Sequence, residues 1–502
     1  MKRGRTSLIA ALIVALLATG AVQTFAQRQR HRLIKNGSSQ VGASLAGMDS
    51  FALALLLGGL RGPLVMFLWM QSENDMQSRN LEGVETQIEW IRLLQPEFDT
   101  VHLFQIWNKA YNLSATLAGE AGKYLVILDA LDYANTVDRE RPDNINILSA
   151  IGGVYNDKLG NSEDKAYFGR RMRMESKWRP DDPPRLAGSR PMRFTSMLNK
   201  DGTIRRQYLE PEAGLAATPA TDQAEVYDGS TLQFLKRYEP FPYGLWPRAL
   251  GYNYLKRAQV LQSTTGQQHI QVSPMVVDSR PALCLRQWSE DEWNLGVAAE
   301  SRLLDVKMPT GRFDALVAVG KADPLKLGAE QIKSREADLT EAMDRYTLSL
   351  RLMSDGIADF KRHLSNPQYQ MHIEMYAAHL DHLTGVSMLV QGDLDLLKSL
   401  HASPDERQQL FADARQQYTR AARAFRITCL RFYSDRRSFI GLLPPDANLT
   451  IFDTLSDEKL EELNQAVIRA IDERGYDNYE GDVREYESYR TRALTRLKML
   501  GN

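Results

Sequence analysis

Eight apolar residues recur every three or four positions between residues 339 and 364, and this run constrains the fold more than any other feature. They are Leu339, Met343, Tyr346, Leu350, Met353, Ile357, Phe360 and Leu364. Alternating spacings of four and three residues are typical of a helix that packs along one apolar seam. The sequence therefore predicts one long helix here, with a stripe that other helices must cover.

Further apolar helical stripes follow this seam. Residues 373–390 and 411–432 each carry one apolar face at helical spacing, and two shorter helices are expected near the C-terminus. Short turns between long helices make neighbours antiparallel. We therefore predict a bundle of long antiparallel helices over 329–502 that covers the seam within the chain. A homodimer joined through the 339–364 seam is the alternative.

Two copies of a weak pattern lie between residues 98 and 155. The first consists of Phe104, Trp107, Asn108 and Tyr111, and the second of Leu148, Ile151, Gly152 and Tyr155. The spacing resembles the first helix of a tetratricopeptide (TPR) unit, where a small residue lets a second helix pack close. Pro96 and Pro142 stand about where such units end. The resemblance implies TPR-like helical hairpins, an α-solenoid, over residues 51–178, and an all-α protein.

Two short stretches carry a second resemblance. Residues 57–62 (LGGLRG) and 104–112 (FQIWNKAYN) are similar to a group of uncharacterised, membrane-anchored bacterial TPR-like proteins. This resemblance implies an N-terminal anchor and an all-helical body. It transfers no catalytic residue to this chain.

The first 30 residues combine a basic start with an apolar run. Three basic residues precede the apolar segment 7–26, and a helix of 20 residues just spans the hydrocarbon core of a bilayer. We predict a single-pass membrane anchor in 1–30; a signal peptide cleaved after Ala26 is the alternative. Basic residues flank both ends, so charge does not decide the orientation. We expect the body on the extracytoplasmic (periplasmic) side, the default for a short basic N-terminus before one span.

The segment after the anchor is expected to be a tether, followed by a second apolar run. Residues 31–50 are first basic and then rich in Gly and Ser. Residues 51–70 are apolar but carry Arg61 at their centre, beside Gly62 and Pro63. A central Arg is costly in lipid, so we predict two short buried helices, or a helix and a turn, that open the soluble body. A second membrane span is the alternative.

The middle of the chain changes character twice. Residues 179–242 are rich in Pro, Gly and charge and are predicted to be an irregular connection. Residues 243–328 read as a helical segment with loops. Within it, 270–277 is rich in β-branched residues and is expected to be extended, and Pro281 is expected in the first turn of the next helix.

Polar residues in the first TPR-like copy are candidate partner contacts. In TPR units the first helices build the binding groove, where polar side chains grip a peptide. Asn108, Lys109 and Asn112 are the candidates, whereas Trp107 and Tyr111 are expected in the core.

A basic stretch between residues 165 and 206 is a second candidate surface. It contains twelve Lys or Arg and four Asp or Glu, a net charge of +8. Such a stretch attracts anionic lipid headgroups or an acidic partner, through Arg170, Arg171 and Arg173. A solvated helix face followed by a charged loop is the alternative. The net charge of -1 for the whole chain argues against nucleic-acid binding.

Three histidines on one predicted helix form a weak candidate metal site. His379 and His382 are close enough to share an ion, whereas His372 lies two turns away. A hydrogen-bonded polar edge on a bundle helix explains them without metal and is the favoured interpretation. The cluster Asp278–Pro281 similarly needs only a helix cap and a salt bridge.

The sequence contains no P-loop, no dinucleotide-binding glycine motif, no zinc-protease motif and no nucleophile elbow. Two distant cysteines, Cys284 and Cys429, make neither a metal knuckle nor a disulfide framework. The main hypothesis is a membrane-tethered helical-repeat scaffold that binds a protein or peptide, with no cofactor and no catalysis. The alternatives are a helical enzyme or metal-binding protein using the His372–His382 face, and a self-associating structural protein of the envelope.

Overall fold

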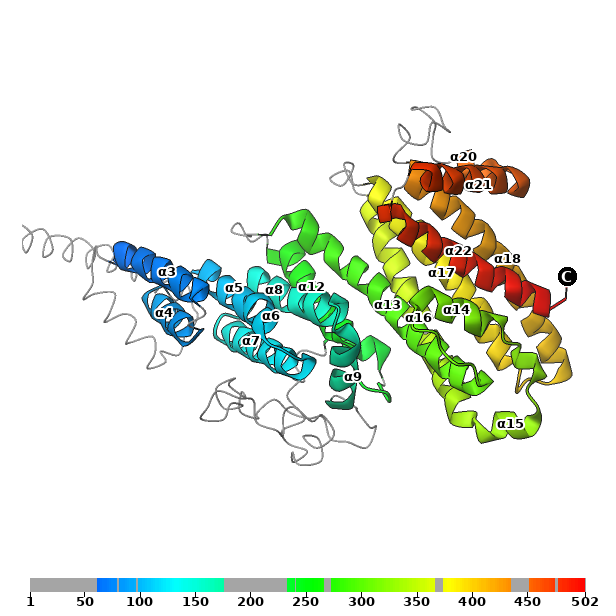
Figure 1. The fold of residues 1–502 in the computed structure, drawn as a ribbon, viewed down its shortest axis with the longest axis horizontal. Helices are drawn as coiled ribbons and strands as arrows, with labels where there is room; N and C mark the ends of the chain where they lie inside the picture. Colours follow the sequence, from blue (N-terminus) through cyan, green and yellow to red (C-terminus); the bar gives the residue numbers. More distant parts are fainter. Residues whose placement is uncertain are drawn as a thin grey trace, which may run out of the picture. The chain divides into compact units, whose positions relative to one another are not determined.

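Every regular element in the computed structural model is helical wherever the chain is described, which confirms the all-α prediction (Figure 1). The description covers residues 61–78, 81–95, 98–175, 233–239, 241–265, 272–365, 373–434, 451–474 and 477–501. Within these ranges, no helix is both long and apolar enough to cross a membrane. The expected anchor, the tether, almost all of the irregular connection and His372 lie outside the described residues.

The chain divides into two compact units, and among described residues the boundary falls between Phe168 and Gly169. The first unit contains α3 (Arg61–Gln77), α4 (Leu81–Leu94), α5 (Asp99–Trp107), the π-helix η2 (Asn108–Leu113), α6 (Ser114–Thr116), α7 (Glu120–Glu140), α8 (Ile145–Gly153), the π-helix η3 (Val154–Leu159) and the start of α9 (Lys165–Glu175).

Local sequence explains why α8 starts where it does and why it packs beside α5. The side chain of Asn144 accepts hydrogen bonds from the backbone N–H groups of Asn146 and Ile147, which caps the helix. The side-chain amides of Asn144 and Asn146 also donate to Asp99 on α5, over 3.0 and 2.8 Å. Arg141 pairs with the same carboxylate at 2.6 Å. These bonds hold the Asp99 pKa below its usual value, although burial opposes the shift.

Both TPR-like copies share a feature that their spacing does not reveal. In each one the α-helix continues into a six-residue π-helix, η2 after α5 and η3 after α8. The break between α6 and α7 falls at Gly119, which has a positive φ of 95°. The expectation that Trp107 lies in the core is wrong, since 49% of its surface is exposed.

Whether these hairpins form a TPR solenoid stays a prediction.

Only the second half of the segment 51–70, where two short buried helices or a helix and a turn are expected, is described, and it is helical but only partly buried. Residues 61–70 belong to the single helix α3, and Arg61, Gly62 and Pro63 form its first turn, where Pro is tolerated. Met66, Phe67 and Met70 are exposed. The opposite face of α3 packs against α4 through Val65, Leu68 and Trp69.

The second unit is built around long helices. It contains the 3-10 helix η7 (Leu235–Tyr238), α12 (Pro247–Thr265), α13 (Pro274–Leu304), α14 (Arg312–Lys321), the 3-10 helix η8 (Pro324–Lys326), α15 (Ala329–Ser334), α16 (Glu336–Leu364), α17 (Ile373–Lys398), α18 (Pro404–Ser434), α20 (Ile451–Thr454), α21 (Asp457–Arg474) and α22 (Asp477–Met499). α13 packs on α16, α16 on α17, α17 on α18 and α18 on α22.

Contacts between these helices run in opposite directions along each pair, so neighbours are antiparallel. Along α13 and α16, Asp278 reaches Arg362, whereas Arg302 reaches Asp338. Along α18 and α22, Phe425 meets Tyr489 and Arg415 donates to the carbonyl of Leu500. Glycines permit the close approaches, since a Cβ added at Gly392 would lie 2.7 Å from the Tyr418 ring.

The predicted seam lies within α16 and is covered by the same chain. Leu339, Tyr346, Met353 and Phe360 are fully buried in the core that α13, α17, α18 and α22 complete. This core also joins the segments expected as 243–328 and 329–502, because Trp293 and Val297 of α13 belong to it.

The expectations for residues 270–281 are wrong where the structure describes them. α13 begins at Pro274, after the N-cap Ser273, and Pro281 lies inside the helix. Proline suits the first helical position, and Pro274 rather than Pro281 has that place. The β-branched residues Val276 and Val277 suggested a strand, but burial of Val277 against the unit's other helices overrides local propensity.

Candidate functional site

Five carboxylates along α13 each bond to a basic side chain from another helix. Asp278 pairs with Arg362 and His363 of α16, Glu290 with His382 of α17 and Arg312 of α14, Asp291 with Arg248 of α12, Glu292 with Arg345 of α16, and Glu300 with Arg492 and Arg496 of α22. Burying a charge is costly unless it is paired. α13 is therefore the element on which every candidate site of the second unit depends.

The Glu300 cluster is closed, in the sense that its charged groups are buried and bond to one another and to backbone carbonyls. Arg492 donates from Nη2 to Glu300 at 2.6 Å, from Nε to Asp393 at 2.9 Å and from Nη1 to the Leu316 carbonyl at 3.0 Å. Arg492, Glu300 and Asp393 are 0–1% exposed. Arg496 also bonds Glu300 and, at 2.9 Å, the carbonyl of Ala322 that ends α14. Burial alone would raise the Glu300 pKa, but the two arginines hold it below its usual value.

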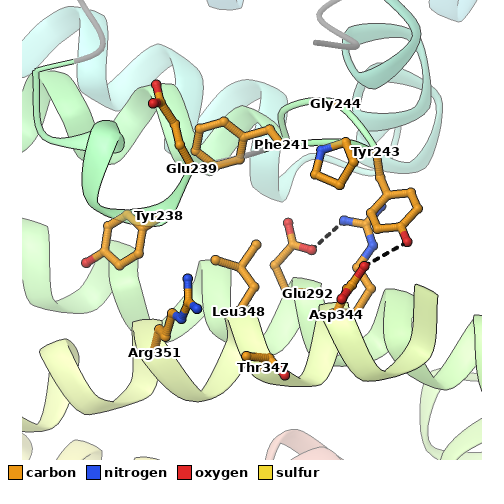
Figure 2. Close-up of a pocket in the computed structure, with 12 residues that line it drawn as sticks. Tyr238, Glu239, Phe241, Tyr243, Gly244, Glu292, Asp344, Thr347, Leu348 and Arg351 are labelled. Carbon is orange, nitrogen blue, oxygen red and sulfur yellow. Dashed lines mark hydrogen bonds and ion pairs between the residues drawn. The ribbon is translucent and has the colours of Figure 1, made fainter. Parts of the chain in front are cut away.

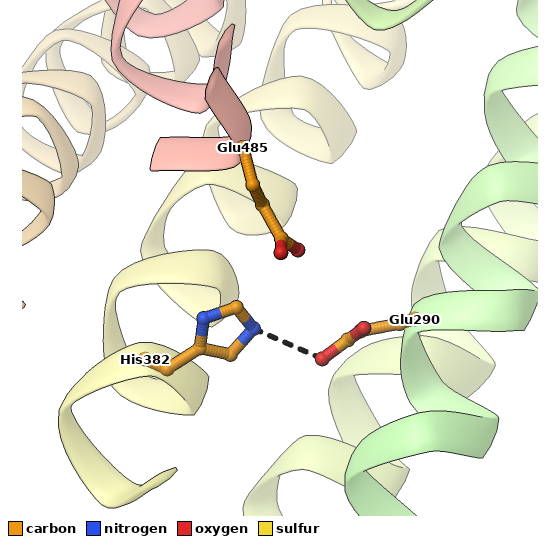
Figure 3. A group of neighbouring side chains, drawn as sticks. All are labelled: Glu290, His382 and Glu485. Atoms are coloured by element: carbon orange, nitrogen blue, oxygen red, sulfur yellow. Dashed lines mark hydrogen bonds and ion pairs between the residues drawn. The ribbon is translucent and has the colours of Figure 1, made fainter. Parts of the chain in front are cut away.

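The Glu290 cluster brings together three groups of the kind that bind metals (Figure 3). Potential ligand atoms of Glu290, His382 and Glu485 all lie within 4.8 Å of one another, and Glu290 and His382 are buried. His382 Nε2 lies 2.9 Å from Glu290 Oε1. The predicted partner His379 is not part of this group.

Two arginines already occupy the carboxylate of Glu290. Arg286 Nε lies 3.0 Å from Oε1, and Arg312 Nη2 lies 3.3 Å from Oε2 and 3.9 Å from Glu485. Two guanidinium groups balance two carboxylates, so a dication would add uncompensated charge in a low dielectric. The donor set suits a metal, but its surroundings favour an ion-pair junction between α13, α14, α17 and α22.

His379 is held in its neutral form beside this junction. Burial, the nearby Arg286 and then His382 lower the His379 pKa to about 3. Arg286 donates its Nη1 hydrogen to His379 Nδ1. The ring therefore acts as a hydrogen-bond acceptor for a buried arginine rather than as a partner of His382.

The Glu292 cluster borders a pocket of about 170 Å³ (Figure 2). One wall is the segment from η7 to Gly244, and the other is one face of α16. The lining residues are Tyr238, Glu239, Phe241, Pro242, Tyr243, Gly244, Glu292, Asp344, Arg345, Thr347, Leu348 and Arg351. Leu348 and Arg351 project from α16 toward the opposite wall.

Hydrogen bonding in the pocket is incomplete. Arg345 is only 3% exposed and donates Nη1 to Glu292, yet its Nη2 has no hydrogen-bond partner among the described residues. Arg351 is exposed and Glu239 half-buried, and neither has an ion pair in the described part of the chain. A buried donor without an acceptor costs about 1–3 kcal/mol. The accessible guanidinium at the pocket is that of Arg351, which favours an occupant that accepts hydrogen bonds.

Contacts on both sides position the aromatic wall of the pocket. The Arg345 guanidinium carbon lies 4.7 Å from the centre of the Tyr243 ring. Outside the pocket, the guanidinium carbon of Arg173 lies 5.3 Å from the centre of the Trp246 ring. The Tyr243 hydroxyl donates to Asp344 at 3.1 Å. Gly244 has a φ of 79°, and a Cβ there would meet the Arg173 carbonyl at 2.2 Å. The wall is therefore held in a defined shape before anything binds.

The predicted contact residues are placed in three different settings. Asn108 and Lys109 are buried, and Lys109 pairs with Asp129 at 2.8 Å, while half-buried Asn112 donates to Asn108. Arg170 is exposed and Arg171 is buried. Arg173 alone lies beside the pocket wall.

Comparison with known protein families, with characterised proteins and with solved structures finds no match for this chain. The candidate sites therefore depend on their own geometry. Sequence reasoning missed the pocket because Glu292, Arg345 and the segment 238–244 share no local motif. The one available signal was an aromatic run, Tyr238, Phe241 and Tyr243, beside a break in helical periodicity.

Proposed function

We propose that this protein is a membrane-tethered helical scaffold that binds a protein partner and does no chemistry of its own. The observation that carries the proposal is the pocket beside α16, which joins a preformed aromatic wall to charged groups without partners. The partner would place a side chain between Tyr243 and Leu348. The membrane tether is the N-terminal anchor expected in 1–30, with the helical body on the extracytoplasmic side.

The composition of the pocket supports binding rather than catalysis. Tyr and Arg are the residue types that dominate binding energy at protein interfaces. The lining contains no Ser, Cys, His or Lys, and the hydroxyl of Thr347 donates to the carbonyl of Met343. Small-molecule and cofactor sites typically occupy about 300–1,000 Å³. The smaller pocket suits one or two side chains of a partner.

Charge indicates which partner segment fits. Arg351 offers donors on the α16 side, and Glu239 offers a carboxylate on the opposite wall. A segment with an acidic side chain would pair with Arg351, and a basic neighbour would meet Glu239. Opposite charges on the two walls would also fix the direction in which the segment lies.

Crosslinking from within the pocket tests this function. A photoreactive residue at Leu348 of the full chain, expressed in cells, should crosslink one polypeptide in stoichiometric amount. The Arg351→Glu variant should abolish this crosslink because it repels the acidic segment. The matched control is Lys361→Glu, which makes a similar charge change at an exposed position of the same helix and should preserve it.

A crosslink that survives Arg351→Glu, or no crosslink at position 348, would disprove the pocket as the binding site. The self-association alternative has less support, because the α16 seam is already covered within the chain. It predicts a mass in solution that rises with protein concentration.

A further inference from the structure

The first three turns of α3 are apolar on two faces, and only one face is covered. Val65, Leu68 and Trp69 pack on α4 and its neighbours. On the other face, Met66 is 69% exposed, Phe67 53% and Met70 61%. These three residues are called the α3 stripe. Contiguous exposed apolar residues mark an interaction surface, because monomeric proteins seldom leave them in water.

The stripe ends where polar residues begin on the same face. Gln71 and Asn74 follow Met70 at helical spacing and are exposed. Arg61 is the only charged residue between Asp49 and Glu73 in the sequence. A surface for an acidic or basic partner would carry complementary charge, whereas the stripe itself carries none and the first exposed charge after it is Glu73. Its occupant must therefore accept uncharged, flexible apolar side chains such as Met and Phe.

The position of α3 in the chain indicates what that occupant is. The expected membrane segment ends at Ala26, so about 34 residues separate it from α3, and a chain of that length reaches at most roughly 110 Å. A tether this short keeps the stripe at a high effective concentration near the bilayer. α3 has 17 residues, fewer than the 20 or so that a membrane span needs.

We propose that the α3 stripe inserts into the interfacial region of a lipid bilayer, with α3 lying along the membrane rather than across it. The proposal rests on the tether of the proposed function, which brings the stripe to the membrane. The contact is driven by burial of apolar surface. Binding of the stripe is therefore expected to be insensitive to salt and to the fraction of anionic lipid, unlike binding through a basic surface.

Depth-dependent quenching of a fluorescent label tests the proposal on the full chain. Cys284 and Cys429 are buried, so an engineered cysteine can be labelled selectively with an environment-sensitive dye. The label goes at Phe67→Cys, with Arg139→Cys, exposed on α7 of the same unit, as the reference. In neutral phosphatidylcholine liposomes, a nitroxide attached to the lipid chains should quench the label at 67 and leave that at 139 unaffected.

Paired substitutions supply the control. Met66→Glu with Met70→Glu should return the label at 67 to water, with loss of lipid quenching and gain of quenching by iodide. Gln71→Glu with Asn74→Glu adds the same charge on the same face just beyond the stripe and should leave lipid quenching in place. Circular dichroism of each variant shows whether the helical fold is retained.

Each contrary outcome has a distinct meaning. If the chain floats with liposomes but the label at 67 is quenched only by iodide, the stripe proposal is overturned and the tether stands. If neither quencher reaches the label, protein covers the stripe and the proposal is equally overturned. If the chain does not float with liposomes, both the tether and the stripe proposal fail.

Discussion

Glu292 and Glu300 lie two turns apart on α13, and each bonds to an arginine that is almost completely buried. The two arginines differ in how many of their guanidinium nitrogens donate hydrogen bonds. All three guanidinium nitrogens of Arg492 donate to oxygen atoms, whereas Arg345 uses Nη1 and leaves Nη2 without a partner. In the first cluster Arg492, Glu300 and Asp393 are 0–1% exposed, whereas the second cluster borders a pocket.

This difference shows that burial alone does not separate a structural charge from a binding charge. What separates them is whether the protein itself completes the hydrogen bonds of the buried group. The Glu300 cluster joins α22 to α13, α14 and α17 and has no donor to offer a ligand on Arg492. The Glu292 cluster lies at the wall of a pocket, and Nη2 of Arg345 has no hydrogen-bond partner among the described residues. Four experiments test this comparison.

The largest effect is expected for Arg492→Met, in the closed cluster. The substitution leaves Glu300 and Asp393 buried with only Arg496 to compensate them, so the free energy of unfolding should fall by about 3–5 kcal/mol. Urea denaturation measures the change. Arg484→Met on the same helix is the control, because Arg484 is 62% exposed and should cost at most about 1 kcal/mol.

A smaller loss is expected for Arg345→Met, at the pocket. Glu292 keeps the hydrogen bond from the Trp288 indole, at 3.2 Å, and it lines the pocket. We expect a loss of about 1–3 kcal/mol in the same denaturation experiment. A loss as large as that of Arg492→Met would show that the two clusters are alike in stability, and it would contradict the distinction between a structural cluster and a binding cluster.

Acidification should weaken the region around His379, which is bonded to Arg286 beside the Glu290 cluster. Its pKa is lowered to about 3, so the unfolded chain takes up the proton first and stability falls as pH drops below about 6.5. Between pH 6.5 and 5 the loss should be at most about 2 kcal/mol. The slope of unfolding free energy against pH measures it.

His379→Asn supplies the control, because asparagine offers Arg286 an acceptor and does not titrate, so this part of the slope should disappear. The contribution of His363 to the pH dependence of stability has the opposite sign. Although burial opposes it, the hydrogen bond to Asp278 raises the His363 pKa. Its stabilisation is complete below about pH 6.5 and is lost as pH rises through the raised value. An unchanged slope in His379→Asn would contradict the assignment.

The smallest effect is expected from zinc at the Glu290 cluster. Because Arg286 and Arg312 already neutralise Glu290 and Glu485, added zinc should leave the melting temperature unchanged. A true site at 100 times its Kd would add about 2.7 kcal/mol of stability. Such a rise, absent in His382→Ala, would restore the metal-binding hypothesis.

Much of the helical content could be predicted from local spacing. The α16 seam from Leu339 to Leu364 was visible because a helix brings residues three and four apart onto one face, whatever else the chain does. The expectation failed at residues 270–277, where β-branched residues form the start of α13. It also failed at Trp107, since a repeat-like position does not report which neighbours cover it.

The candidate site could not be predicted from local spacing. Its donors and acceptors lie far apart in sequence: Arg345 and Glu292 are separated by 53 residues, and Arg492 and Glu300 by 192. Which arginine is completed by carbonyl groups and which is left facing a pocket depends on how α14, α22 and the segment 238–244 pack on α13 and α16.

The sequence by itself thus determined that this chain forms long amphipathic helices and that one of them carries an extended apolar seam. Those properties depend on contacts within a few residues. The tertiary structure alone decided which buried charges are closed and which face a pocket, and which face of α3 stays uncovered. Those outcomes depend on packing between elements that no local pattern connects.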